Sequence, residues 1–165
     1  MPSGRVHDGV NTVLTLAVVP VAYAKGFDVA DIVLFTLGSL FATYYLSPDL
    51  DLEGTRPVRR WGHLSFIWKP YSSVVPHRGI SHYPVVGILT RLGYLFLIFA
   101  LFWFSFVGLL HYLGLSPPRL DPYAVLKPRV WGPFLMGALF ADTLHIAMDY
   151  VWSSLKRKGR RRRRG

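Results

Sequence analysis

The residues of this chain best suited to chemistry are histidines and aspartates that gather at or near the ends of long apolar segments. Cysteine is absent, so any metal must be held by imidazole and carboxylate groups, which suit divalent transition ions. Ionisable groups are costly where they approach lipid, so their placement there is by default a functional hypothesis. We therefore predict a metal site formed by His7, Asp49, Asp51, His77, His82, Asp142, His145 and Asp149.

One candidate cluster follows a proline that ends an apolar segment. In the stretch from Ser47 to Leu52, Pro48 removes a backbone donor and stops the helix. Alternation along an extended strand would then place Asp49 and Asp51 on one side. This pattern predicts two carboxylate oxygens that face the same point.

A second cluster surrounds a glycine in the stretch from His77 to His82. Gly79 permits the backbone to double back, so that the imidazoles of both histidines reach one point. Arg78 lies between these candidate ligands and is placed to clamp an anionic substrate.

A third cluster lies on the last apolar segment. Asp142, His145 and Asp149 are spaced i, i+3 and i+7, which places them within about 60° of one face of a helix. The alternative is a set of buried acids hydrogen-bonded to neighbouring helices, and Asp142 could support a ligand rather than be one. His7, beside Asp8, becomes a ligand candidate because it lies at the same membrane face as the other clusters.

The composition indicates the elements that must position these residues. With 52% hydrophobic residues in a chain of 165, there is more apolar surface than a soluble globule of this size can bury. The third apolar segment covers about 31 residues, or roughly 46 Å of helix, against a hydrocarbon core of ~30 Å. We predict an all-α integral membrane bundle of about four transmembrane helices: Val10–Ala24, Val29–Leu46, Val85–Leu115 and Trp131–Leu155.

Positive charge predicts the orientation of such a bundle. Four spans place both termini and the segment between spans 2 and 3 on one side, together with all 19 Lys and Arg residues except Lys25, Arg119, Lys127 and Arg129. We therefore expect a protein of the cell membrane with both termini and the metal site in the cytoplasm. The rival is a cleaved signal peptide ending at Ala24, and the single basic residue Arg5 before the first span argues against it.

The segment Glu53–Pro76, between spans 2 and 3, interleaves aromatic residues with arginine and lysine, as an interfacial loop or helix does. Two interpretations stay open: an aromatic belt with charges that set the topology, or a lid or lipid-docking surface beside the site. We interpret His63, in this segment, and His111, at the far end of span 3, as interfacial residues rather than ligands.

We divide the chain into one membrane-embedded metal-binding domain, residues 1–155, and a polybasic cytoplasmic tail, residues 156–165. The expected partners are membrane lipids, with the tail against an anionic leaflet, where each cation could gain on the order of 1 kcal/mol. A tail that only sets the topology is the simpler reading. Specific recognition of a nucleic acid is not expected, because a run of arginines attracts any polyanion.

Together the clusters resemble a family of small prokaryotic membrane proteins described as uncharacterised metal-binding proteins, which is similar to the YdjM-like inner-membrane metal-dependent hydrolases. The resemblance implies a membrane location, metal binding and, through the wider group, hydrolase activity. It rests on these stretches: Ser3 to Asp8, Ser47 to Leu52, Arg59 to Gly62, Pro76 to His82, and Asp142 to Asp149.

The resulting hypothesis is a membrane-bound hydrolase that depends on one or two divalent ions, with zinc first and manganese or another transition metal next. Phosphoester bonds of a membrane-associated or anionic substrate fit both the metal and the surrounding cations. Two alternatives remain. A non-catalytic scaffold would have a closed coordination shell, and a metal transporter would need ligands near the bilayer midplane.

Overall fold

The computed structural model describes residues 3–76, 79–119, 121 and 127–162, and all regular elements in those ranges are helices. The predicted all-helical class is therefore confirmed. The four long helices are α1 (Gly4–Ala24), α2 (Val29–Tyr45), α5 (Pro84–Tyr112) and α7 (Pro128–Arg162). The short ones are η1 (Pro48–Asp51), α3 (Arg56–Arg60), η2 (Gly62–Trp68), α4 (Lys69–Val74) and η3 (Ile80–His82).

Three segments are long and apolar enough to cross a membrane: Val29–Asp51, Pro84–Tyr112 and Pro128–Lys156. The first of the four predicted spans, Val10–Ala24, forms as part of helix α1, but α1 does not reach the hydropathy of a membrane span. Its first half carries Arg5, His7, Asp8 and Asn11, which lower its hydropathy. Length and composition therefore support three spans rather than four.

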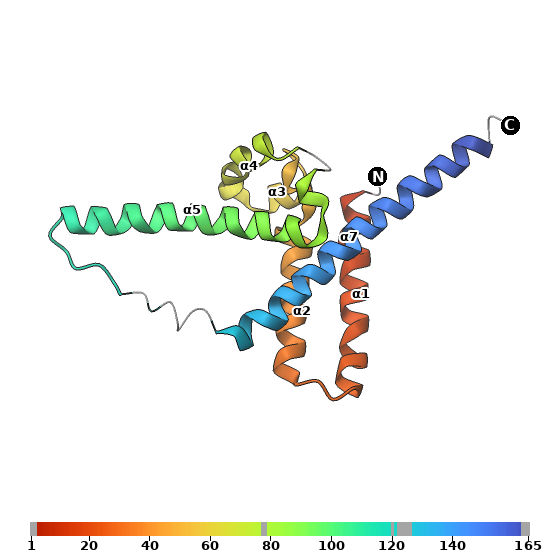
Figure 1. Ribbon diagram of the computed structural model, residues 1–165, viewed down its shortest axis with the longest axis horizontal. Coiled ribbons are helices and arrows are strands. Elements are labelled where there is room, and N and C mark those ends of the chain that lie inside the picture. Colours follow the sequence, from red (N-terminus) through yellow and green to blue (C-terminus); the bar gives the residue numbers. More distant parts are fainter. Residues whose placement is uncertain (1–2, 77–78, 120, 122–126, 163–165) are drawn as a thin grey trace.

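Helices α1 and α2 form an antiparallel hairpin, and α7 packs across both of them (Figure 1). The hairpin turns at Gly26, whose φ of 79° is easily adopted only by glycine. Polar side chains join the two helices: the hydroxyls of Thr15 and Ser39 are 2.6 Å apart, and Asn11 donates to the carbonyl of Ala141 on α7 at 3.1 Å. These buried polar contacts explain why α1 stays in the bundle despite its lower hydropathy.

The contact between α2 and α7 is a close approach of two backbones. A Cβ built on Gly38 would lie 1.9 Å from the carbonyl oxygen of Phe134, and one built on Gly137 would lie 1.9 Å from that of Phe35. Only glycine fits at either position. Together with Ala42, which is 1% exposed, Gly38 forms a small-residue contact surface on α2.

The segment between α2 and α5 folds into short helices above the first turns of α5 (Figure 1), and its buried residues belong to one core that also includes residues of α2, α5 and α7. Trp68 and Tyr71 are 1% and 4% exposed and pack with Leu46 and Leu50. Burial raises the pKa of Tyr71 above its usual value, so its phenol stays neutral and shares a hydrogen bond of 3.2 Å with Thr90 on α5. The segment is therefore a packed platform. It also keeps an apolar surface, because Leu64 and Phe66 remain exposed.

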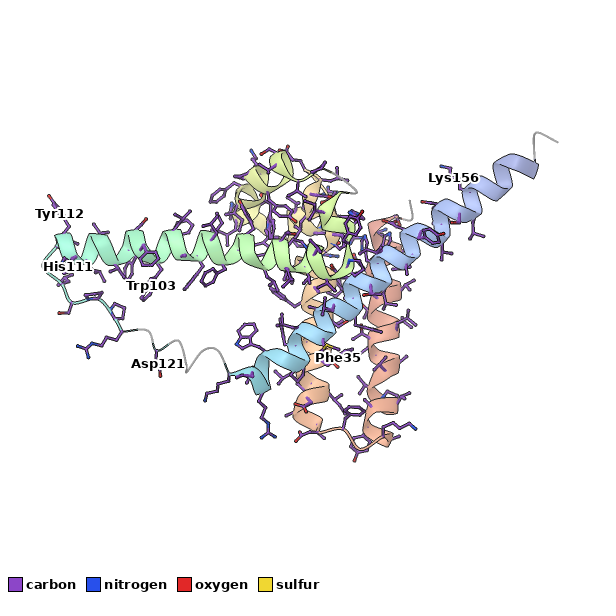
Figure 2. The ribbon with its side chains drawn as sticks, viewed as in Figure 1. Phe35, Trp103, His111, Tyr112, Asp121 and Lys156 are labelled. Atoms are coloured by element: carbon purple, nitrogen blue, oxygen red, sulfur yellow. The ribbon has the colours of Figure 1, made fainter. Side chains whose placement is uncertain are left out.

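Helix α5 leaves this platform and projects away from the other helices (Figure 1), with its far end marked by Trp103, His111 and Tyr112 in Figure 2. No residue of its most apolar 18-residue window is buried in the described structure. Its 29 residues measure about 44 Å, which exceeds a hydrocarbon core of ~30 Å. The apolar surface of α5 is therefore of the kind that lipid covers.

Candidate metal centre

Histidines and aspartates from four separate elements converge where α7 crosses α1 and the end of α2. His7 belongs to the second turn of α1, Asp49 to η1, His82 to η3, and both His145 and Asp149 to α7. Contacts between α1 and α7, η1 and η3, and α7 and η1 hold these elements together. The predicted convergence of the clusters is thus present in the fold.

The donor atoms lie within a few ångströms of each other. His7 Nε2 is 3.2 Å from Asp149 Oδ1, and His82 Nε2 is 3.8 Å from Asp149 Oδ2. His145 Nε2 is 3.6 Å from Asp49 Oδ1 and 4.0 Å from Asp149 Oδ2. Two ligands of one ion bound at 2.0–2.1 Å are roughly 2.9 to 4.2 Å apart, depending on the angle between them. All four distances fall in that range.

Two overlapping groups of three residues can hold an ion: His7, His145 and Asp149, and Asp49, His82 and His145. Within each group the donor atoms lie within 4.8 Å of one another. The groups share His145, whose Nε2 atom is near both Asp49 and Asp149. Because one ring nitrogen binds one ion, this sharing favours a single ion among the five residues.

The chemistry of these donors fits a divalent cation. Asp149 Oδ1 and Oδ2 and His145 Nε2 are buried and make no hydrogen bond within the described part of the chain. A buried polar atom without a partner is costly, and a bound cation would satisfy all three at once. The rings of His7 and His145 stack with centroids 3.9 Å apart, which brings two imidazoles to the same side of Asp149.

Asp51 occupies a different position from Asp49, and the prediction of an extended strand that aims both inward is wrong. Pro48–Asp51 form a 3-10 helix, in which residues two apart point in different directions. Asp49 faces His145, whereas Asp51 lies 3.5 Å from His82 Nδ1 and accepts a hydrogen bond from the Ser81 hydroxyl. A carboxylate close to the ring nitrogen that does not face the metal orients a histidine ligand. Asp51 lies near Nδ1 of His82 in this way, while Nε2 of His82 faces Asp149.

Asp142 belongs to neither group of donors. It is 1% exposed and pairs with Arg91 of α5, which is completely buried. Arg91 is therefore a buried, paired charge and not one exposed at the surface. The pair connects α5 to α7, and Arg91 Nε also donates to the carbonyl of Gly87 at 3.0 Å. A lone arginine inside an apolar run is the sequence signal that predicts such a buried partner.

His77 and Arg78, predicted as a ligand and as a substrate clamp, lie outside the described residues. His63 and His111 are exposed, and His111 is at the far end of α5 (Figure 2). Sequence reasoning did not identify Ser81, which is buried beside Asp51, or the ion pair between Asp8 and Arg60 at 2.6 Å. No spacing rule indicates the Asp8 pair, since its partner comes from a different helix.

These features define a class: a helical protein with membrane-type spans and a buried histidine and aspartate cluster at one end of its helix crossing. The chain belongs to the family "Uncharacterized metal-binding protein (DUF2227)", whose model matches residues 2–159. It is similar to an uncharacterized protein of Aquifex aeolicus, with 42% identity over 130 residues that cover 74% of this chain and 92% of the relative. No solved structure matches the chain.

Proposed function

We propose that the protein is a membrane-embedded hydrolase that depends on one divalent transition ion. Zinc is the first candidate and manganese or another transition metal the next, because the donors mix imidazole nitrogen with carboxylate oxygen. The resemblance to YdjM-like hydrolases agrees with this class of reaction. The proposed donors are His7, Asp49, His82, His145 and Asp149, and His77 could add a further one.

The observation that carries the proposal is the burial of donor atoms without hydrogen bonds. Asp149 offers two such oxygens and His145 one nitrogen, at ligand-to-ligand distances from their neighbours. An ion held by these residues supplies Lewis acidity and an acidified water, the general basis of metal-assisted hydrolysis. The protein's contribution is to fix the donors, with Asp51 orienting the ring of His82.

Access to the centre is from the side of Asp49. The side chain of Asp49 is 19% exposed, whereas those of His7 and His145 are only 5% and 4% exposed. A substrate group therefore reaches the donors past η1 rather than through the packed interior. The nearby arginines of α3 favour an anionic group, and the apolar helices favour a substrate presented by the membrane, so a phosphoester of a membrane-associated compound is the proposed substrate class.

A non-catalytic scaffold is the second candidate, and one observation favours it. The donors come from α1, η1, η3 and α7, so a bound ion would join elements from both ends of the chain. Binding free energy at such a site is folding free energy, whether or not the ion also performs chemistry. A scaffold predicts stabilisation by the metal without turnover.

Elemental analysis of the detergent-purified chain is the first test, with one ion per chain expected. His145→Ala and Asp149→Ala should each lose most of the metal, while the exposed controls His63→Ala and His111→Ala should retain it. Circular dichroism must show that the variants remain helical, because a lost donor leaves uncompensated buried charge. Full metal in both folded donor variants would end the proposal.

The second test separates a hydrolase from a scaffold. The metal-loaded chain should release phosphate or alcohol from a vesicle-borne phosphomonoester or phosphodiester lipid. The rate should fall when a chelator removes the ion, and it should fall in Asp49→Asn. The scaffold would be supported instead if the metal-loaded chain hydrolyses no phosphoester and yet loses thermal stability when a chelator removes the ion.

A further inference from the structure

An open pocket of about 520 Å³ lies beside the first turn of α1 and shares no residue with the metal centre. Its lining comes from two elements that meet there, the start of α1 and the short helix α3. The lining residues are Ser3, Gly4, Arg5, Arg56, Arg59 and Arg60. Four of the six are arginines, and the other two are small.

The pocket has a large excess of positive charge. Its arginines have one acidic neighbour with a described contact, Asp8, whose Oδ2 atom is 2.6 Å from Arg60 and 3.9 Å from Arg56. Arg5 and Arg59 make no ion pair within the described ranges and are exposed. Four guanidinium groups and one carboxylate leave a net positive charge that exceeds the charge of a dianion, so the pocket attracts such an anion strongly.

The structure holds part of this pocket in a fixed shape. Arg60 contacts both oxygens of Asp8, donates to the carbonyl of Tyr44 at 3.3 Å, and places its guanidinium carbon 4.6 Å from the centre of the Tyr44 ring. The side chain of Arg56 packs over Gly4, where a Cβ would lie 3.4 Å from Arg56 Cδ. Two arginines are thus anchored, while Arg5 and Arg59 keep their donors available.

We propose that this pocket binds a phosphate group, carried by a lipid headgroup or by a soluble phosphomonoester. Arginine donates pairs of parallel hydrogen bonds that match phosphate oxygens, and a phosphomonoester carries close to two negative charges. The side chain of Ser3 does not cap α1, so the positive end of this helix is not offset by a side-chain acceptor and adds to the attraction for an anion. The pocket is one α-helical turn from His7, at the end of the bundle where the metal centre lies.

Titration calorimetry of the detergent-purified full chain tests the proposal, with three probes: a short-chain phosphatidic acid, a short-chain phosphatidylcholine and glycerol 3-phosphate. Arg5→Gln/Arg59→Gln should weaken binding of phosphatidic acid at least tenfold. The matched control, Lys25→Gln/Lys127→Gln, removes the same charge from exposed lysines outside both the pocket and the basic tail, and it should bind like the unchanged chain. Metal content measured in parallel should stay the same in both double variants.

Stronger binding of phosphatidic acid than of glycerol 3-phosphate would assign the phosphate to a lipid, and equal binding would assign it to a soluble compound. An equal loss of phosphatidic acid binding in both double variants would overturn the proposal, because it would indicate a general attraction to positive charge. Equal binding of phosphatidylcholine and phosphatidic acid would also overturn it, because it would indicate binding of the acyl chains. Because metal content is recorded separately, failure here is distinguishable from failure of the metal centre.

Discussion

Asp49 and Asp51 are separated by a single residue and yet contact different histidines. The 3-10 geometry of η1 directs Asp49 to His145 and Asp51 to His82. The first carboxylate is therefore positioned as a donor to an ion, and the second as the support of a donor. Substitutions that keep the size of the side chain can separate these two functions.

Asp51→Asn should lower metal affinity about 10-fold to 100-fold, because His82 loses the carboxylate that orients its ring. At saturating metal the variant should still bind the same number of ions. Competition with a chelator of known affinity measures the first quantity, and elemental analysis at excess metal measures the second.

Ser81→Ala is the companion variant, because the Ser81 hydroxyl donates to Asp51 and lies 3.1 Å from His82 Nδ1. It should change affinity in the same direction but by less than Asp51→Asn. A loss of bound ions at saturating metal in Asp51→Asn would contradict a supporting role and make Asp51 a direct ligand.

At this scale the sequence predicts types of residue better than it predicts partners. The spacing of His145 and Asp149 on one helical face is local, so it can be read without a structure, and the convergence with His7 follows from the shared end of the spans. The pairing of Asp142 with Arg91 and of Asp8 with Arg60 depends on which helices cross, which no local pattern specifies. The same holds for Asp51, because alternation cannot distinguish an extended strand from a 3-10 turn after Pro48.

Among the elements, the crossing of α2 and α7 depends on two glycines that face each other's helix backbone. A methyl group on Gly137 would overlap the carbonyl of Phe35, a residue at the contact that Figure 2 labels. The centre lies further along the same helix, so the position of His145 and Asp149 depends on this contact.

Gly137→Ala should destabilise the protein by about 1–3 kcal/mol, since the two helices must move apart to admit the added carbon. Gly132→Ala on the same helix is the control. No atom would lie within 4 Å of its Cβ, so it should be neutral or stabilising by up to ~1 kcal/mol. Unfolding by denaturant in detergent measures both, and equal effects of the two variants would show that the contact is not close.

The link between α5 and α7 is the buried pair of Arg91 and Asp142. Arg91→Leu leaves Asp142 as an uncompensated buried charge and should cost about 3–5 kcal/mol, whereas Arg91→Leu/Asp142→Leu should recover much of that loss. Arg129→Leu is the control, because its pair with Asp28 is 3.6 Å long and solvent-exposed, and it should cost at most ~1 kcal/mol.

The same unfolding midpoints measure this series. If the double variant is as unstable as Arg91→Leu, the loss in Arg91→Leu does not come from the isolated charge of Asp142. The ion pair itself would then stabilise the protein. Element bounds were largely predictable here, since apolar runs indicated all four long helices. The lone Arg91 inside the apolar run indicates a buried partner, but no local pattern specifies that this partner is Asp142 on α7.

At the scale of the whole molecule, three segments meet the length and hydropathy of a membrane span and α1 does not. The path of α1 nevertheless follows from packing. It lies antiparallel to α2 and is joined to it by buried hydrogen bonds, so we predict that α1 accompanies α2 through any membrane that α2 crosses. Charge counting along the sequence cannot supply this argument, because it needs the number of spans beforehand.

Single cysteines test the topology without background, because the natural chain has none. Ser73 precedes the start of α5 and Ser116 follows its end, and both positions are exposed. A membrane-impermeant reagent on intact cells should label Ser116→Cys, whereas Ser73→Cys and Ser3→Cys should need permeabilised cells. Labelling of Ser73→Cys and Ser116→Cys from the same side would show that α5 does not cross, and labelling of Ser3→Cys from outside would show that α1 does not.

The position of the donors along the chain determines when the centre can exist. His7 lies on α1 and is synthesised well before His145 and Asp149, which lie on α7, the last helix in the described part of the chain. A growing chain that has made α1, α2 and α5 but not α7 still lacks His145, the residue that both possible groups of donors share. We therefore expect the metal to bind only after α7 has been made and has docked against α1 and α2, and until then no ion joins α1 to α7.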